Sequence, residues 1–158
     1  MIYLLIFIIL VLADQISKAV VFALFERTSV TVIDGLFSIT CTYNKGAAFS
    51  MFAGEEWAQI FFIGVTVIAA VIALCYLIFS AGESKWLKAS ITTILAGAAG
   101  NLIDRLAMQK VRDFLFVEFF ANCNLADVAV TVGAIMLFIY LLFLSPDALF
   151  KQKKNENA

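Results

Sequence analysis

Four long apolar runs dominate this sequence and limit the folds that are open to it. They cover about residues 2–25, 57–81, 87–107 and 125–144. A helix needs about 20 predominantly apolar residues to cross the hydrocarbon core of a bilayer. Because 63% of the 158 residues are hydrophobic and only 15% are charged, a soluble domain of this length would have more apolar surface than its core could bury. The sequence therefore predicts an all-α integral membrane protein with four transmembrane helices.

The four runs predict one membrane domain over residues 1–150, followed by a polar tail over 151–158. The first run begins "MIYLLIF", without a basic segment, and contains Asp14 and Lys18, so we expect it to stay in the protein rather than to be a cleaved signal peptide. Four spans place both termini on the same side of the membrane. That side carries five Lys or Arg residues and the other side carries four, which favours cytoplasmic termini.

Two loops lie on the outer side of the predicted bundle. In the first, 26–56, Asp34-Gly35 stands between β-branched and aromatic stretches, which indicates a hairpin and a small extracytoplasmic sheet. The second, 108–123, contains "FLFVEFF", which is too apolar for a solvated linker and too short to span the bilayer. We expect an interfacial aromatic segment there. Packing against the helix ends without a function is the alternative.

The composition excludes several kinds of function. The chain has no histidine, which removes His-based catalytic triads and the commonest metal ligand. Its three cysteines form no C-x-x-C motif, so neither a disulfide framework nor a metal site is indicated. A net charge of -1 with scattered basic residues gives no footprint for nucleic acid. We expect no cofactor, and any catalysis would use carboxylate, lysine, serine or cysteine groups.

Ionisable groups inside the predicted spans are the first candidates for function, because each costs about 2.5 to 3.5 kcal/mol at mid-helix on insertion scales. Asp14 and Lys18 are spaced i, i+4, so they can neutralise each other on one helix face. Gln15 adds an amide that can bind backbone or substrate. A structural role for the Asp14–Lys18 pair is as consistent with this spacing as direct chemistry.

The third run, 87–107, is the least apolar of the four. Small residues such as Ala96 and Gly100 allow helices to approach closely in lipid, so we expect this helix at the centre of the bundle. Gly97, Asn101 and Asp104 follow i, i+4, i+7 spacing on one face. That face presents an amide, a carboxylate and bare backbone that a peptide could approach.

The tetrapeptides "NLID" and "NLAD" end in Asp104 and Asp127, on antiparallel helices joined by one loop. Both carboxylates are therefore expected at similar depth, where a pair of carboxyl groups can perform acid–base hydrolysis of an amide. Two simpler interpretations stay open. Asn124 can be the N-cap of the fourth helix, with Asp127 in its first turn, and Asp104 can pair with Arg105 or Lys110.

Five motifs taken together resemble the bacterial lipoprotein signal peptidases, also called signal peptidase II. They are "DQISK" (14–18), "NKGAAF" (44–49), "AGAAGNLIDR" (96–105), "VRDF" (111–114) and "NLAD" (124–127), and they span nearly the whole chain. The resemblance implies a membrane aspartyl endopeptidase that cleaves diacylglyceryl-modified prolipoproteins just before the lipidated cysteine. It implies membrane lipids as surroundings, a site near the extracytoplasmic face of the bacterial cytoplasmic membrane, and action as a monomer.

The resemblance assigns the catalytic pair to Asp104 and Asp127, with a water activated between them. The residues expected to bind substrate or support the site are Asp14, Gln15, Lys18, Asn44, Gly46, Gly97, Asn101, Arg105 and Asn124. The segment around 114–120 resembles a mobile outer segment of the family, which predicts a lid. Arg112 stands where the family often has an apolar residue, and Cys123 where it often has an aromatic one.

Two other functions fit parts of the sequence. A serine–lysine hydrolase would use Ser17 or Ser50 with Lys18 or Lys45, although neighbours on a helix point about 100° apart. A small proton-coupled membrane transporter or assembly factor would use the same carboxylates as a proton relay, and it predicts that they lie spread along a transmembrane path.

Overall fold

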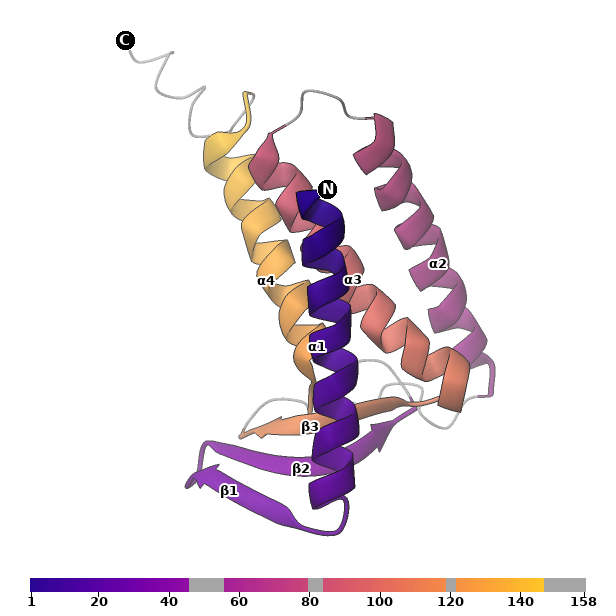
Figure 1. The fold of residues 1–158 in the computed structure, drawn as a ribbon, viewed down its shortest axis with the longest axis vertical. Coiled ribbons are helices and arrows are strands. Elements are labelled where there is room, and N and C mark those ends of the chain that lie inside the picture. The colour runs from indigo at the N-terminus through magenta and orange to yellow at the C-terminus, as the bar shows by residue number, and fades with distance from the viewer. Residues whose placement is uncertain (46–55, 80–83, 119–121, 147–158) are drawn as a thin grey trace.

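The computed structural model describes residues 1–45, 56–79, 84–118 and 122–146. These residues form four long helices and a three-stranded sheet that lies across one end of them (Figure 1). The helices are α1 (Ile2–Phe25), α2 (Glu56–Phe79), α3 (Lys85–Met108) and α4 (Leu125–Ile139), and α4 continues into a π-helix, η2 (Tyr140–Leu144). The N-terminus and η2 lie at the end of the molecule opposite the sheet (Figure 1).

Three of the described helices are long and apolar enough to cross a membrane. They are α1, the stretch Gln59–Phe79 of α2, and the stretch Leu125–Leu144 of α4 and η2. Only 11%, 0% and 17% of their apolar windows is buried inside the protein, so most of these side chains point outward. Exposing that much apolar surface to water would be strongly unfavourable, at about 25 cal/mol per Å². The helices therefore present the surface that a lipid environment requires.

The helix α3 packs against α1, α2 and α4 and is the centre of the bundle, which confirms the prediction for this run. Its buried face carries small and hydroxyl-bearing residues. The hydroxyls of Ser90 and Thr92 donate to the carbonyl oxygens of Leu87 and Lys88, at 2.8 and 2.7 Å. Because these polar groups are satisfied within the helix, α3 can bury them between its neighbours.

Gly97 lies at the contact between α3 and α4. A Cβ atom at this position would lie 2.3 Å from the carbonyl oxygen of Ala126 and 2.7 Å from a methyl group of Val130. The backbone that was expected to be open to a peptide is therefore covered by α4, and that prediction is wrong. The physical reason is that helices in lipid gain van der Waals contact by bringing small residues together.

The sheet is antiparallel, in the order β1 (Ser29–Ile33), β2 (Phe37–Asn44), β3 (Val111–Val117). Gly35 lies in the turn between the first two strands with φ +66°, a conformation that favours glycine, and this confirms the predicted hairpin. Asn44, the last residue of β2, pairs with Val111, the first of β3. The sheet therefore joins the loop after α1 to the loop after α3.

The loop 108–123 contains a strand that the sequence analysis did not assign. Residues predicted as an interfacial aromatic segment form β3, and Phe114 is buried, with 4% of its surface exposed. Val111–Val117 therefore belongs to the sheet, which corrects the prediction of a separate lid for this part of the segment, whereas Phe119 and Phe120 lie outside the described residues. Apolar and polar residues do not alternate strictly along this run, so the usual sequence signal of a strand is missing. Its backbone N–H and C=O groups pair with β2, which lies far away in the sequence.

Candidate active site

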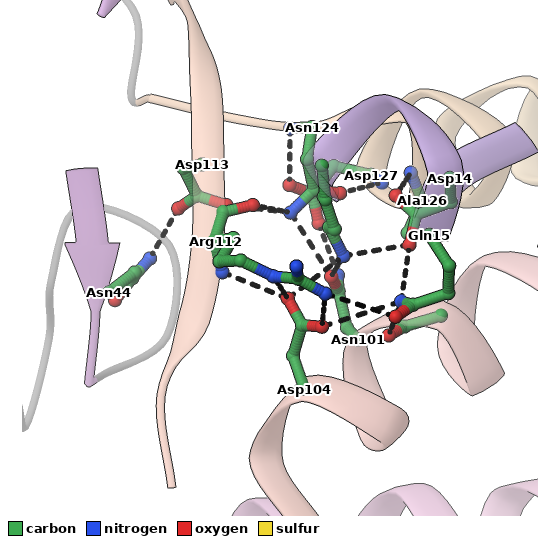
Figure 2. A network of polar contacts seen from close by, with 12 residues as sticks. Asp14, Gln15, Asn44, Asn101, Asp104, Arg112, Asp113, Asn124, Ala126 and Asp127 are labelled. Carbon is green, nitrogen blue, oxygen red and sulfur yellow. Dashed lines mark hydrogen bonds and ion pairs between the residues drawn. The ribbon is translucent and has the colours of Figure 1, made fainter. Parts of the chain in front are cut away.

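Charged and amide side chains from α1, α3, β3 and the start of α4 meet where the helices reach the sheet (Figure 2). The most deeply buried of them, each with no more than 1% of its surface exposed, are Asp14, Lys18, Asp104, Asp113 and Asn124. An isolated buried charge costs several kcal/mol. The contacts among these residues must therefore compensate for their removal from water.

Lys18 is the central cation of this cluster. Its Nζ lies 2.8 Å from Oδ2 of Asp14 and 3.4 Å from Oδ2 of Asp104, and it donates to Oδ1 of Asn101 at 2.9 Å. The i, i+4 pair of Asp14 and Lys18 predicted from the sequence is confirmed. Asp104 and Asn101 of α3 make further contacts with the same lysine. A single lysine thus joins two carboxylates on different helices.

Asp14 contacts the beginning of α4 as well as Lys18. Its Oδ1 accepts a hydrogen bond of 2.8 Å from the backbone N–H of Ala126. Gln15 Nε2 donates to Oδ2 of Asp14 at 3.1 Å and to the carbonyl oxygen of Gly100 at 3.0 Å. A Cβ atom at Gly100 would lie 2.6 Å from Asp14 Oδ2, so only glycine lets α3 pass this carboxylate. Asp14 therefore contacts both α3 and α4 and helps to hold α1 against them.

Asp104 is held by Arg112, the residue before Asp113 on β3. The backbone N–H and the Nε of Arg112 donate to Oδ2 of Asp104 at 3.0 and 3.3 Å, and Nη2 lies 2.8 Å from Oδ1. With Lys18 on its other side, Asp104 is paired with two cations. The simpler interpretation of Asp104 as an ion-paired group is therefore right, but the cations in these contacts are Lys18 and Arg112 rather than Arg105 or Lys110.

Asp127 lies in the first turn of α4, in a capping box with Asn124. The Asn124 side chain accepts from the Asp127 backbone N–H at 3.0 Å, and Asp127 Oδ2 accepts from the Asn124 backbone N–H at 3.0 Å. The N-cap interpretation of "NLAD" is confirmed. Asn101 Nδ2 also donates to Oδ1 of Asp127, at 2.7 Å, so both carboxylate oxygens have an N–H donor.

Asp113 is a third carboxyl group in this cluster, and the sequence analysis did not select it as a site residue. Asn44 Nδ2 donates to its Oδ2 at 3.1 Å, and Asn124 Nδ2 donates to its Oδ1 at 2.6 Å. Burial, and next the nearby charge of Asp127, raise the pKa of Asp113 to about 6. A buried carboxyl with a raised pKa is typical of a group that holds or moves a proton. Its motif, "VRDF", was the available signal.

Asn124 connects Asp113 directly to Asp127. Its Nδ2 donates to Asp113 while its Oδ1 accepts from the backbone of Asp127 (Figure 2). Asp104 is connected to Asp127 less directly, through Lys18 and Asn101 and through Arg112 and Asn124. One residue therefore stands between Asp113 and Asp127 in the network, and two stand between Asp104 and Asp127.

The other expected site residues have different surroundings. Asn44 joins the network through Asp113. The guanidinium of Arg105 lies 5.4 Å from the ring centroid of Phe62 on α2, a cation–π arrangement. Gly46 lies outside the described residues. Of the predicted support set, the network includes Asp14, Gln15, Lys18, Asn44, Asn101 and Asn124.

The contacts of Ser17 and Lys18 do not form a serine–lysine dyad. The Ser17 hydroxyl donates to the carbonyl oxygen of Asp14 at 2.9 Å, and the Lys18 amine is paired with Asp14 and Asp104. Ser50 lies outside the described residues. Asp104, Asp113 and Asp127 also lie in one network of polar contacts rather than along a transmembrane path (Figure 2).

Comparison with protein families gives a match over nearly the whole chain. The family model Peptidase_A8, described as signal peptidase (SPase) II, matches residues 6–143. A lipoprotein signal peptidase of Bacillus velezensis is 39% identical over 149 residues, which cover 90% of this chain and 95% of that protein. One of Symbiobacterium thermophilum is 35% identical over 140 residues, 85% of this chain and 90% of that protein.

Solved structures resemble the fold over the same extent. One, described as a bacterial membrane enzyme at 2.3 Å resolution, has a TM-score of 0.79 and 29% sequence identity, and the match covers 98% of this chain and 90% of the other. A second, at 1.9 Å, also has a TM-score of 0.79, with 28% identity over 90% of this chain and 94% of the other. The four helices and the sheet thus have counterparts of known structure.

Proposed function

This chain belongs to the signal peptidase II family, and we propose that it is an aspartic endopeptidase that removes the signal peptide from bacterial prolipoproteins. The substrate is the diacylglyceryl-modified form, and cleavage occurs just before the lipidated cysteine. The observation that supports this function best is the pair of carboxyl groups of Asp113 and Asp127, which accept hydrogen bonds from the side chain and from the backbone N–H of the same residue, Asn124.

The catalytic pair in this proposal is Asp113 and Asp127. The sequence motifs predict Asp104 as the partner of Asp127, but the carboxylate of Asp104 is paired with Arg112 and Lys18, which suits Asp104 to a structural role. Asp113 has no such cation within its hydrogen-bonding contacts in the described part of the chain; its donors are the amides of Asn44 and Asn124. Amide donors hold a carboxyl group in place without preventing it from exchanging a proton.

Hydrolysis follows the general acid–base scheme of paired carboxyl groups. In this scheme Asp113 is the member of the pair that starts with the proton, because its pKa is raised to about 6, and bound substrate, by excluding water, raises it further. Its proton is donated to the oxygen of the scissile carbonyl while Asp127 takes a proton from the attacking water. The neutral tetrahedral intermediate then collapses: the C–N bond breaks, the proton on Asp127 goes to the leaving amine, and one hydroxyl of the intermediate returns its proton to Asp113 as the C=O bond re-forms.

The surroundings of Asp127 suit it for the role of base. Its carboxylate accepts hydrogen bonds from the backbone N–H of Asn124, the N-cap of α4, and from the side-chain amide of Asn101. The first turn of a helix also stabilises negative charge through the helix dipole. Asn101 in turn accepts from Lys18, so the buried cation supports the base through one amide.

The membrane provides access to the substrate. In the proposed topology all four helices, α1 to α4, cross the membrane, the sheet and the site face the extracytoplasmic side, and both termini are cytoplasmic. The diacylglyceryl chains lie against the exposed apolar helix surfaces, where each buried CH₂ contributes about 0.8 kcal/mol relative to water, although the bilayer already provides part of this. Lipidation therefore orients the cysteine more than it tightens binding. One chain supplies every carboxyl and amide of the proposed site, which fits a monomer.

Cleavage of a purified lipidated prolipoprotein tests the proposal, with mass spectrometry of the released signal peptide and the new N-terminus. Asp113→Asn and Asp127→Asn should each lower kcat by at least about 100-fold, since each removes a group that transfers a proton. Asp104→Asn should keep measurable activity. Full activity of Asp127→Asn would reject any aspartate mechanism here.

The two carboxylate assignments can be separated in the same assay. If Asp113→Asn were active and Asp104→Asn inactive, the pair would be Asp104 and Asp127, as the sequence motifs suggested. Flux of protons in proteoliposomes without any cleavage of prolipoprotein would instead favour the transporter.

A further inference from the structure

Arg112 joins the strand that carries Asp113 to two helices. Its guanidinium donates to both oxygens of Asp104 on α3, and Nη2 also donates to Oε1 of Gln15 on α1, at 3.1 Å. The Asp104 side chain is fully buried, while 18% of the Arg112 side chain is exposed. Nothing in the proposed chemistry requires a cation at this position, so its contacts need another explanation.

The backbone of Arg112 is held as firmly as its side chain. Its N–H donates to Asp104 at 3.0 Å, and its carbonyl oxygen accepts from Asn124 Nδ2 at 3.2 Å. The same Nδ2 donates to Asp113 at 2.6 Å. Charge-assisted hydrogen bonds from a planar guanidinium to a buried carboxylate are among the strongest that side chains make. One residue therefore connects α3, β3 and the N-cap of α4.

The turn that these bonds cross is short and contains an unfavourable backbone conformation. It runs from Met108, the last residue of α3, to Val111, the first of β3, and Gln109 within it has φ 55°. A non-glycine residue in this left-handed region costs about 1 kcal/mol or more. The Asp104–Arg112 pair spans the turn and can offset that cost, which holds the start of β3 against α3.

Asp113 depends on that position because it is the next residue along the strand. Its carboxyl reaches Asn44 and Asn124 from β3, and the charged or ionisable groups that influence it are Asp127 of α4, Lys18 of α1, Arg105 of α3 and Cys123. A shift of about 1 Å in a reacting group can lower catalysis about 100-fold.

We propose that Arg112 is a positioning residue for peptide cleavage, which fixes β3 against α3 and α1 so that the Asp113 carboxyl stays dry and beside Asp127. The inference rests on the proposed function, because it assigns Asp113 to the chemistry. Arg112 itself touches neither the scissile bond nor the water. It acts through Asp104, Gln15 and the strand backbone.

Three variants test this role. Arg112→Met keeps the apolar stem but removes the charge and the donors; Arg112→Lys keeps the charge without the paired geometry; and Arg27→Met changes an exposed arginine at the end of α1 as the control. Arg112→Met should lower kcat by about 10- to 100-fold with KM within about threefold. Arg112→Lys should recover part of kcat, and Arg27→Met should match the wild type.

The pH dependence distinguishes positioning from simple loss of stability. When β3 loosens, water reaches Asp113 and its pKa moves down toward the ordinary value, so the alkaline limb of the kcat profile should shift to lower pH in Arg112→Met. Infrared difference spectroscopy of the carboxyl stretch, assigned with Asp113→Asn, should show the same shift without substrate. If Arg112→Met does not fold, Arg112→Lys is measured in the same two ways and should show a smaller shift.

Several outcomes would overturn the proposal. An unchanged titration of Asp113 together with a lower melting temperature would mean that Arg112 only stabilises the fold. Equal kcat in Arg112→Met and the wild type would remove the role altogether. Failure of the proposed function looks different: Asp113→Asn would then be active, while the effect of Arg112 on the Asp113 titration, measured without substrate, would still decide whether Arg112 positions this strand.

Discussion

At the scale of single residues, the buried polar cluster shows why identical chemical groups have different roles. Asp104 and Asp113 both carry a carboxyl group with little or no exposure. Cations contact the first, whereas two amides contact the second. A carboxylate between two cations is suited to hold structure together, and a carboxyl beside amides and a second carboxyl is suited to exchange a proton. Burial alone therefore does not distinguish Asp113, the proposed catalytic aspartate, from Asp104, the proposed structural one.

The raised pKa of Asp113 makes a prediction about stability. An aspartate with a pKa near 3.8 when unfolded and about 6 when folded binds its proton more tightly in the folded state. The stability that this proton contributes is complete below about pH 3.8 and is lost as the pH rises through about 6. The full shift corresponds to about 3 kcal/mol, of which about 2 kcal/mol is lost between about pH 4.5 and 7.5.

Asp113→Asn removes this titration, so its melting temperature in detergent should rise relative to the wild type as the pH increases over that interval. Scanning calorimetry or a thiol-reactive dye assay of both proteins at the two pH values provides the measurement. A constant difference between the two proteins would show that the pKa of Asp113 is not raised by folding.

At the scale of secondary-structure elements, contact between α3 and α4 depends on positions without side chains. Gly97→Ala should destabilise the protein by about 1 to 3 kcal/mol or more, because its Cβ would meet the carbonyl oxygen of Ala126 at 2.3 Å and neither backbone can yield cheaply. Gly64 on α2 is the matched control, since a Cβ there has nothing within 4 Å. Thermal unfolding in detergent should show a lower melting temperature for Gly97→Ala only.

Gly64→Ala should be neutral or slightly stabilising, by up to about 1 kcal/mol, from the better helix propensity of alanine. If both variants unfolded at the temperature of the wild type, the close approach of α3 and α4 would not be required for the fold.

The end of α3 allows a stabilising substitution. Gln109 caps the helix in the left-handed conformation, with φ 55° and ψ 25°, and its N–H donates to the Arg105 carbonyl oxygen. Gln109→Gly should raise the free energy of unfolding by about 0.5 to 1 kcal/mol, because glycine adopts this conformation without steric cost. Met108→Gly, one residue earlier and within the helix, should lower it by a similar amount. Denaturant titration in mild detergent measures both changes, and a loss of stability in Gln109→Gly would contradict the conformation.

At the scale of the whole molecule, the sheet lies at one end of the helices, so the two ends of the protein differ. The sheet brings β3 and the residue Asn44 of β2 to the ends of the helices, where the buried charges lie (Figures 1 and 2). In the proposed function the exposed apolar faces of the helices contact lipid, and the polar cluster beside the sheet carries out the chemistry. Substrate that is anchored in lipid can therefore reach the site without leaving the bilayer surface.

This arrangement predicts the orientation of the protein in the cell. In a background with Cys41, Cys75 and Cys123 replaced by serine, Ser29→Cys on β1 should react with a membrane-impermeant maleimide added to intact cells. Lys85→Cys, at the opposite end, should react only after the membrane is permeabilised. Labelling in the reverse pattern would place the site on the cytoplasmic side and contradict the proposed topology.

Local patterns in the sequence were sufficient for several features. The apolar runs predict the helices because the length and hydrophobicity of a helix are properties of adjacent residues. The i, i+4 spacing of Asp14 and Lys18 and the N-cap at Asn124 are equally local, and both predictions are confirmed. The turn at Gly35 depends on one backbone angle that glycine favours.

Only the tertiary structure decided which side chains face one another. "FLFVEFF" becomes part of a strand because the edge of β2, far away in the sequence, pairs with it. That pairing brings Asp113 to Asn44 and Asn124, while Arg112 pairs with Asp104. The two aspartates of "NLID" and "NLAD" share a motif, yet the direction of each side chain is set by packing between helices and strands. The amino-acid sequence alone is enough to predict a membrane helix bundle with a group of carboxylates inside it. How those carboxylates are paired follows from tertiary contacts, because the pairing depends on elements that are remote in the chain.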